Sequence, residues 1–161
     1  MGGVKVWRVC HRKYKDSAFT GEGARLFGAR FNSEGVAAVY TSGSLSLSLL
    51  EMLVQTNDRS YLRHCIVFQA EVPESLVDSP ALTDLPEGWN KIPYGHVSQK
   101  YGDRWIESKT NPVLRVPSVV VPVEYNYVLN SNHPDFENIR IKQYKEKLID
   151  ERLFMIPDDV Q

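Results

Sequence analysis

The stretch GARFN, residues 28–32, is followed closely by VYTS, residues 39–42, and by LSLSLLEMLV, residues 45–54. These pieces predict a turn, a strand and a helix in succession. They carry an arginine on the turn, Arg30, and a glutamate on the helix, Glu51. Such an arrangement can hold an anion and present a carboxylate beside it. We therefore expect this stretch to organise the fold and to contain most of the functional site.

The turn that contains Arg30 has the residue types of an anion-binding turn. Gly28 lets the backbone bend where a side chain would obstruct it. Phe31 is an apolar anchor, so Arg30 and Asn32, on alternate positions, are expected to point to the other face. An arginine held by a turn can bind a phosphate or a carboxylate through two N–H groups. The alternative for Arg30 is an internal salt bridge.

The helix that follows a buried strand at residues 36–41 is expected to begin at a cap formed by Thr41 or Ser42 and to end near Gln55. Glu51 is its only charged residue, and a carboxylate there must reach solvent or find a partner. Arg30 is one candidate partner, a ligand with hydroxyls is a second, and an exposed glutamate is the third option. The apolar face consists of Leu45, Leu49, Met52 and Leu53, and the polar stripe of Ser44, Ser48, Glu51 and Gln55.

A second polar position lies far along the chain. Residues 113–116 predict a strand that Pro117 ends, because proline fixes its own φ and lacks an amide donor. Ser118 is then expected at a bend with its hydroxyl free, and a serine bonded to its own turn is the alternative. Further strands are predicted at 5–9, 65–68 and 139–143, and the last of these is expected to form a closing hairpin with 147–153. A helix is predicted at 95–109, with Val97, Tyr101, Trp105 and Ile106 on its core side. A loop with Asn126, Asn130 and Asn132 is expected to donate hydrogen bonds.

The 161 residues fit one domain, so we predict a single α+β (mixed α/β) domain over residues 1–161 with a central mixed sheet. The net charge of −1 argues against direct nucleic-acid binding. The absence of a signal peptide or membrane-length apolar run predicts a cytoplasmic protein with no membrane partner. Cys10-His11 and His64-Cys65 resemble metal-ligand pairs, but neighbouring residues of a strand point to opposite faces, so no metal site is expected.

The residue types also suggest a substrate class. Arg30 would neutralise a phosphate, and Glu51 would contact ribose hydroxyls and stabilise positive charge that develops at an anomeric carbon, as carboxylates do in glycoside cleavage. Ser118 would orient the other half of the ligand. The sequence contains no phosphate loop, no G-x-G-x-x-G fingerprint and no G-x-S-x-G or H-E-x-x-H motif.

Several longer segments match a known pattern. They are Arg8 within VWRV, then GEGARLFGARFN, GVAAVYTS, LSLLEML, LRVPSVVVP, NYVLNSNHPDF and DERLF near the C-terminus. In this order they resemble the RES-domain proteins, the toxins of the Xre–RES toxin–antitoxin systems, over nearly the whole chain. Two positions depart from the pattern, since Phe31 stands where tryptophan is frequent and Ala29 where glycine is frequent.

The resemblance implies that the arginine, glutamate and serine of the family are Arg30, Glu51 and Ser118. It implies that Arg8 and Tyr40 line the same pocket, and we count Asn32 of the turn with these ligand-binding residues. It further implies a fold similar to ADP-ribosyltransferases and diphtheria-type toxins.

The implied activity is cleavage of the nicotinamide–ribose bond of NAD, with water or phosphate as acceptor. NAD would be the substrate, and no cofactor is expected. The implied partners are an Xre-like helix-turn-helix antitoxin that covers the site and a second copy in a homodimer. Two other hypotheses remain open: transfer of ADP-ribose to a macromolecule, and a non-catalytic ligand-binding module.

Overall fold

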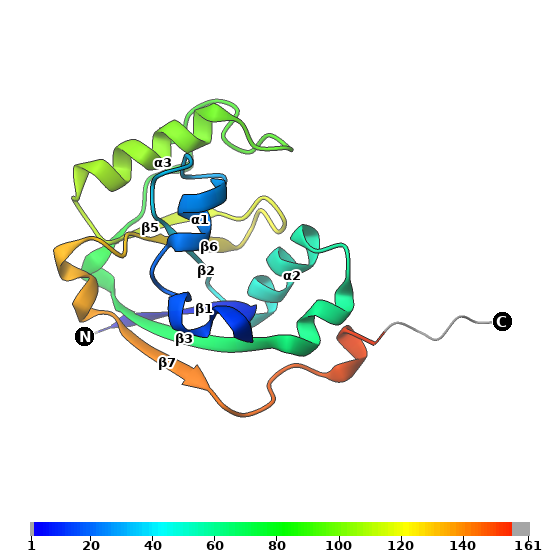
Figure 1. The fold of residues 1–161 in the computed structure, drawn as a ribbon. Helices are drawn as coiled ribbons and strands as arrows, with labels where there is room; N and C mark the ends of the chain where they lie inside the picture. Colours follow the sequence, from blue (N-terminus) through cyan, green and yellow to red (C-terminus); the bar gives the residue numbers. More distant parts are fainter. Residues whose placement is uncertain (1, 156–161) are drawn as a thin grey trace.

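A computed structural model describes residues 2–155 and contains one curled, seven-stranded sheet in the order β4-β5-β6-β2-β1-β3-β7 (Figure 1). Only β4 and β5 run parallel, and the other neighbours are antiparallel. This confirms the predicted mixed α/β domain. The strands are β1 Gly3–His11, β2 Val39–Ser42, β3 Cys65–Pro73, β4 Val77–Asp78, β5 Val113–Pro117, β6 Tyr125–Leu129 and β7 Arg140–Tyr144, and the helices are α1 Glu22–Phe27, α2 Leu45–Gln55 and α3 His96–Ser108.

The sheet consists of two halves that meet at a single residue pair. β1 and β3 pair over nine positions, whereas β1 and β2 pair only between Trp7 and Ser42. β2 in turn pairs with β6 over four positions, from Val39 with Leu129 to Ser42 with Asn126. Directly paired residues share a face of the sheet. Ser42 and Asn126 therefore point to one face, which we call the site face.

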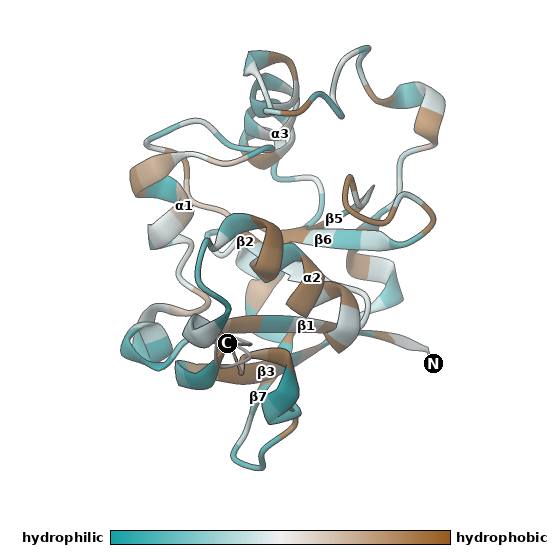
Figure 2. Ribbon diagram, turned by 90° about the vertical axis from the view of Figure 1, so that its right-hand side faces the viewer, coloured by the Kyte–Doolittle hydropathy of each residue, from teal (hydrophilic) through white to brown (hydrophobic). Residues whose placement is uncertain are grey.

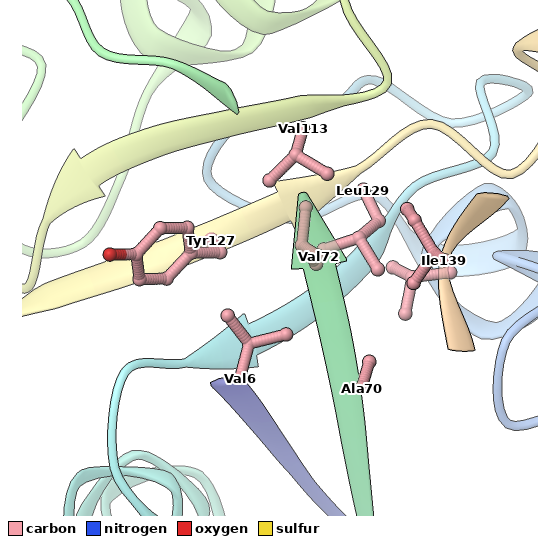
Figure 3. Packing of buried hydrophobic residues seen from close by; sticks show 8 residues of the cluster. Val6, Ala70, Val72, Val113, Tyr127, Leu129 and Ile139 are labelled. Atoms are coloured by element: carbon pink, nitrogen blue, oxygen red, sulfur yellow. The ribbon is translucent and has the colours of Figure 1, made fainter. Parts of the chain in front are cut away.

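Each face of the sheet buries its own apolar cluster. The cluster opposite the site face lies between both halves of the sheet and contains Val6, Val39, Ala70, Val72, Val113, Tyr127, Leu129 and Ile139 (Figure 3). On the site face, α3 and the segment before it pack against β5 and β6. That cluster contains Phe31, Ala38, Leu85, Trp89, Trp105, Leu114, Val116 and Val128.

Helix α2 lies over β1 (Figure 2), and its predicted apolar face is confirmed by the side chains that pack there. Its predicted cap is wrong. Ser44 is the N-cap, and its hydroxyl accepts a hydrogen bond from the Leu47 amide at 3.1 Å. Thr41 and Ser42 instead end β2, where their hydroxyls bond to β6. The apolar residues that pack here from α2 are Leu45, Leu49, Met52 and Leu53.

Three other predicted elements differ from the structure. The expected loop around Asn126 is strand β6, because residues 125–129 pair with β2 on one side and β5 on the other. The strand near 139–143 is present as β7, but it pairs with β3 and not with 147–153, which contains a 3-10 turn at Glu151–Leu153. In α3, Tyr101, Trp105 and Ile106 face the core as predicted, whereas Val97 is 46% exposed.

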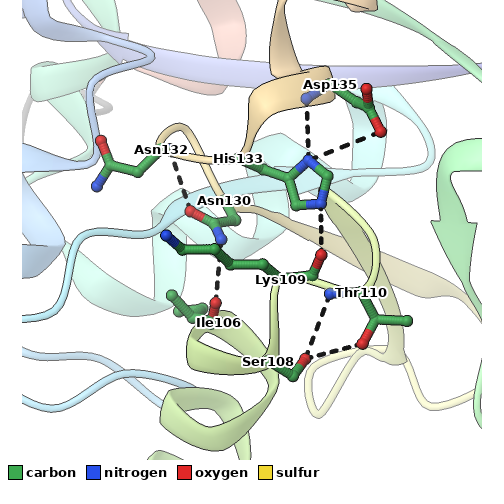
Figure 4. A network of polar contacts seen from close by, with 8 residues as sticks. All are labelled: Ile106, Ser108, Lys109, Thr110, Asn130, Asn132, His133 and Asp135. Carbon is green, nitrogen blue, oxygen red and sulfur yellow. Dashed lines mark hydrogen bonds and ion pairs between the residues drawn. The ribbon is translucent and has the colours of Figure 1, made fainter.

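A polar network fixes the end of α3 against the segment after β6 (Figure 4). The buried ring of His133 accepts a hydrogen bond at Nδ1 from the Asp135 amide, so its Nε2 carries the proton and donates to the Lys109 carbonyl at 2.8 Å. Asn130 donates to the Ile106 carbonyl. The bond from His133 gives the Lys109 carbonyl a donor at the end of the helix, where carbonyls lack intrahelical donors, and the bond from Asn130 adds a second donor to the Ile106 carbonyl, which also accepts the Lys109 amide.

The two cysteines are free thiols on neighbouring strands. His11 pairs with Cys65, so Cys10 and Cys65 lie on opposite faces of the sheet and cannot form a disulfide. Burial raises the pKa of the Cys65 thiol to about 11. Within residues 2–155, no helix has the length and apolar character needed to cross a bilayer.

Gly102 lets α3 approach the turn that carries Arg30. A Cβ at position 102 would lie 1.8 Å from the carbonyl oxygen of Phe31, far inside van der Waals contact. The helix backbone and the backbone of the turn therefore touch directly. This contact explains a glycine in the middle of a helix, where it would otherwise be unfavourable.

We predict that Gly102→Ala lowers the free energy of unfolding by about 1–3 kcal/mol, because overpacking outweighs the better helix propensity of alanine. Gly23→Ala in α1 is the matched control, because nothing lies within 4 Å of its Cβ position. The control is expected to be neutral or stabilising. Urea denaturation measures both, and a Gly102→Ala protein as stable as wild type would contradict the close contact.

Candidate active site

The Glu51 carboxylate is held through one of its two oxygens. Oε1 accepts a hydrogen bond from the Ser118 hydroxyl at 2.8 Å and another from the Asn126 amide at 2.6 Å. Oε2 makes no hydrogen bond within residues 2–155. Glu51 is only half-buried, so this second oxygen is the part of the carboxylate that a ligand can reach.

The Ser118 hydroxyl has all its hydrogen-bonding positions occupied. It donates to Glu51 and accepts from the backbone amides of Val120 and Val121, each at 3.0 Å. A hydroxyl has one proton and two lone pairs, so no position remains for a ligand in this arrangement. Ser118 lies at the predicted bend, but the prediction that its hydroxyl is free is wrong, and the alternative, a serine bonded to its own turn, is confirmed. It acts on Glu51 and shapes the loop between β5 and β6.

Arg30 is anchored by carbonyls and keeps donors free. One terminal nitrogen, Nη1, donates to the carbonyls of Trp89 at 3.0 Å and Lys91 at 2.8 Å, and the guanidinium lies 5.8 Å from the centre of the Tyr94 ring. Nε and Nη2 make no hydrogen bond within residues 2–155, which leaves three N–H donors. Arg30 also forms no ion pair there.

Arg30 and Glu51 lie close enough to attract each other, although they do not form the salt bridge that the sequence left open. Burial lowers the pKa of Arg30, and the attraction of the Glu51 carboxylate opposes that shift. The two charges are therefore near each other without direct contact, and Oε2 of Glu51 and three donors of Arg30 have no hydrogen-bond partner within residues 2–155. A ligand with an anionic group and a hydroxyl-bearing group fits this pair.

Tyr40 and Asn32 hold the turn that carries Arg30 through buried hydrogen bonds. The Tyr40 hydroxyl accepts from the Phe31 amide at 3.0 Å and donates to the Asn32 side-chain oxygen at 2.7 Å. Asn32 is 0% exposed, and its amide nitrogen donates to backbone carbonyls, among them Ala24 at 2.8 Å and Val36 at 2.9 Å. Asn32 therefore holds the turn and orients Tyr40, and it does not share the outward direction of Arg30 that alternation predicted.

Arg8 stands where the two halves of the sheet separate. It follows Trp7, whose pairing with Ser42 is the only one between β1 and β2, and its Nη1 donates to the Tyr40 carbonyl at 3.0 Å. Its Nε is buried without a partner within the described residues, and burial lowers its pKa. A buried guanidinium without an anion is costly, so this position suits an anionic ligand. No hydrogen bond links Arg8 to Glu51 or Arg30.

Other chemically active side chains lie apart from this cluster. His11, at the end of β1, and His64, just before β3, approach each other with ring centres 5.7 Å apart, and neither ring bonds to Glu51, Ser118 or Asn126 within residues 2–155. Among residues 2–155, no three His, Cys, Asp or Glu side chains gather as a metal would require.

Two residues that contact the Glu51 cluster, Asn126 and Ser42, were not predicted to belong to the site. Asn126 lies on β6 and donates to Glu51, and Ser42 donates to the Asn126 oxygen at 2.7 Å. In the sequence, Asn126 is one of several asparagines in a segment predicted as a loop. The signal that could have identified the strand is the alternation of Tyr125, Tyr127 and Leu129, which lie on the face opposite Asn126.

The fold and the site together define a mixed α/β domain in which a carboxylate fixed by two donors stands beside an arginine with free donors, at the junction of a divided sheet. The RES domain pattern matches residues 5–151. The chain therefore belongs to the RES domain family, which confirms the resemblance seen in its motifs.

Named relatives cover most of the chain. A Sphingobium protein named Prs ADP-ribosylating toxin is 35% identical over 155 residues, 93% of this chain and 96% of the relative. A Yersinia enterocolitica protein named Toxin Res is 37% identical over 134 residues, 83% of this chain and 88% of the relative. A second Toxin Res, from Photorhabdus laumondii, is 35% identical over 131 residues, 81% of this chain and 84% of the relative.

We predict that Tyr40→Phe lowers the free energy of unfolding by about 1–3 kcal/mol, because the Phe31 amide and the Asn32 oxygen lose their buried partner. Tyr14→Phe is the control, since that side chain is 50% exposed. Denaturant unfolding at neutral pH measures the difference. Equal losses in both variants would contradict the role of the buried hydroxyl.

The same residue predicts an alkaline effect. Burial raises the pKa of the Tyr40 phenol, so its contribution to stability is complete below the unfolded value of about 10 and is lost as pH rises beyond it. Wild type should therefore lose more stability than Tyr40→Phe between about pH 10 and pH 11. Parallel losses in the two proteins would show that Tyr40 does not titrate in this way.

Proposed function

We propose that this protein is a toxin that cleaves the nicotinamide–ribose bond of NAD. The observation that carries the proposal is the Glu51 carboxylate, with one oxygen fixed by Ser118 and Asn126, the other without a hydrogen-bond partner within residues 2–155, and the charge of Arg30 nearby. The membership of the RES domain family supports it, as do the relatives named as toxins.

The chemistry of NAD matches a site with one carboxylate. The nicotinamide of NAD is a pyridinium, so when the bond between ribose C1′ and the ring nitrogen breaks, the electron pair goes to the nitrogen and a neutral leaving group departs. No general acid is needed. Most glycosidases need a second carboxyl group to protonate their leaving group. Here one carboxylate suffices, because its task is to stabilise the positive charge that develops on the ribose.

The remaining residues take binding and positioning roles. The free N–H donors of Arg30 suit a bidentate contact with the NAD pyrophosphate, and the unpaired guanidinium of Arg8 adds positive charge at the sheet junction. The Tyr40 ring packs beside the nicotinamide. Ser118 acts through Glu51, because its hydroxyl is saturated by protein partners.

The acceptor of the ADP-ribosyl group defines two versions of the reaction. Water gives ADP-ribose and a proton, and phosphate gives the 1″-phosphate ester of ADP-ribose. Transfer to a macromolecule is the second candidate, because the Sphingobium relative is named as an ADP-ribosylating toxin. NAD labelled in its adenine half separates the versions, since a transferase leaves label on a macromolecule. A non-catalytic ligand-binding module would release no nicotinamide at all.

The family also supports a proposal about partners and location. We place the protein in the cytoplasm, where NAD is available, with an Xre-like helix-turn-helix antitoxin as the partner that covers the open side of Glu51. A homodimer is the proposed oligomeric state. NAD is the substrate, and the proposed reaction requires no metal or cofactor.

We predict that Glu51→Gln keeps the fold and loses most nicotinamide release, because glutamine can still accept both hydrogen bonds but carries no charge. Glu107→Gln, on the exposed side of α3, is the control with the same change of charge. Purified proteins are incubated with NAD, with and without phosphate, and the products are identified. A Glu51→Gln protein that destroys NAD at the wild-type rate would exclude the proposed role.

A further inference from the structure

We propose that Ser42 and Asn126 form a positioning relay that aims the Glu51 carboxylate at the substrate. In this relay Ser42 fixes the orientation of the Asn126 amide, and Asn126 fixes Oε1 of Glu51 so that Oε2 faces the ligand. The proposal rests on the proposed function of Glu51 and extends it to two residues that do not contact the substrate themselves.

The orientation of the Asn126 amide follows from the chemistry of its two neighbours. A carboxylate in this cluster only accepts hydrogen bonds, so the Asn126 atom that lies 2.6 Å from Glu51 Oε1 must be the NH₂ group. The other end of the amide is then the oxygen, which accepts the Ser42 hydroxyl proton at 2.7 Å. Ser42 is 3% exposed, so water does not replace it readily.

The Ser42 hydroxyl is what prevents the opposite orientation of the amide. Without it, the Asn126 oxygen has no donor, and a half-turn of the amide would place that oxygen against the Glu51 carboxylate. Two acceptors would then repel each other. The hydrogen bond from Ser42 makes one orientation favourable, and this orientation gives Glu51 its second donor.

The relay stands on the rigid part of the fold. Ser42 and Asn126 are directly paired residues of β2 and β6, and Ser42 also pairs with Trp7 of β1. Ser118, the other donor to Glu51, lies in the loop between β5 and β6. Groups fixed on strands hold a geometry more closely than groups on loops. The strand residues therefore set the direction of Oε2, and Ser118 of the loop adds the second hydrogen bond that fixes the Glu51 carboxylate.

The test compares the steady-state cleavage of NAD by the wild-type full-length protein and by three variants of it. Asn126→Ala is expected to lower kcat by about 10- to 100-fold and Ser42→Ala by about 10-fold, as for the loss of residues that orient a reacting group. KM for NAD should change little, because Arg30 and Arg8 keep their contacts with the phosphates. The third variant combines both changes, and Ser42→Ala should have no further effect in the Asn126→Ala background.

Two further variants separate positioning from simple support of the fold. Asn126→Asp is isosteric and should be milder than Asn126→Ala if the residue only fills space, but the relay predicts that it is worse, because it sets a carboxylate against Glu51. Thr41→Val removes a buried hydroxyl from the same strand on the other face, where it donates to the Tyr127 carbonyl at 2.9 Å. This control should lose stability and keep kcat.

Each outcome has one meaning. A wild-type protein that releases no nicotinamide overturns the proposed function, and the relay as a catalytic device with it. An active wild type with unchanged kcat in Ser42→Ala and Asn126→Ala overturns the relay alone. Additive effects of the two changes, or an Asn126→Asp protein more active than Asn126→Ala, also overturn it. Unfolding measurements on every variant identify a loss of activity that comes from loss of fold.

Discussion

The hydrogen bonds from Ser118 and Asn126 to Glu51 Oε1 are the contacts on which the site depends. They join a helix to residues 67 and 75 positions later in the chain, so they exist only when β5, β6 and α2 are all in place. A carboxylate with two donors on one oxygen has a fixed direction. The fold thus converts a solitary glutamate on an apolar helix into a charge with a defined open side.

The divided sheet provides the space in front of that charge. β1 and β2 share one residue pair, and beyond it the Arg8 side chain, not a strand ladder, connects β1 to the Tyr40 carbonyl. The halves of the sheet are free to diverge there while their apolar clusters hold them together on either side. Arg8 lies buried at the junction, and Arg30 with free donors lies near the Glu51 carboxylate, whose second oxygen has no partner within residues 2–155; this pair suits a ligand with an anionic group and hydroxyls.

Local patterns in the sequence predicted much of this fold and the position of the main charges. The amphipathic face of α2 and the bend at Ser118 follow from residues close together in the chain, so they were predictable. Asn126 was not, because its place depends on strand pairing with β2 and β5, and the register between distant strands is not written in local periodicity. The prediction of the α2 cap was wrong for the same reason, since the hydroxyls of Thr41 and Ser42 bond across to β6.

The hydrogen-bond partners of Arg30 could not be predicted from the charges in the sequence. The sequence offered an anion or an internal salt bridge, and the structure gives two backbone carbonyls, of Trp89 and Lys91, which composition does not reveal. The need for glycine at position 102 is likewise not evident from the sequence, because it comes from the close contact with the Phe31 carbonyl. Side-chain identity predicted which groups form the site, and backbone geometry decides how they are held.

The most direct measurement of the central claim is a crystal structure of the Glu51→Gln protein with NAD bound. We expect the nicotinamide ribose against the side chain of residue 51, on the side opposite Ser118 and Asn126, with the pyrophosphate on the free donors of Arg30. NAD bound elsewhere on the protein, or bound here in the reverse direction with the adenine half against residue 51, would contradict it.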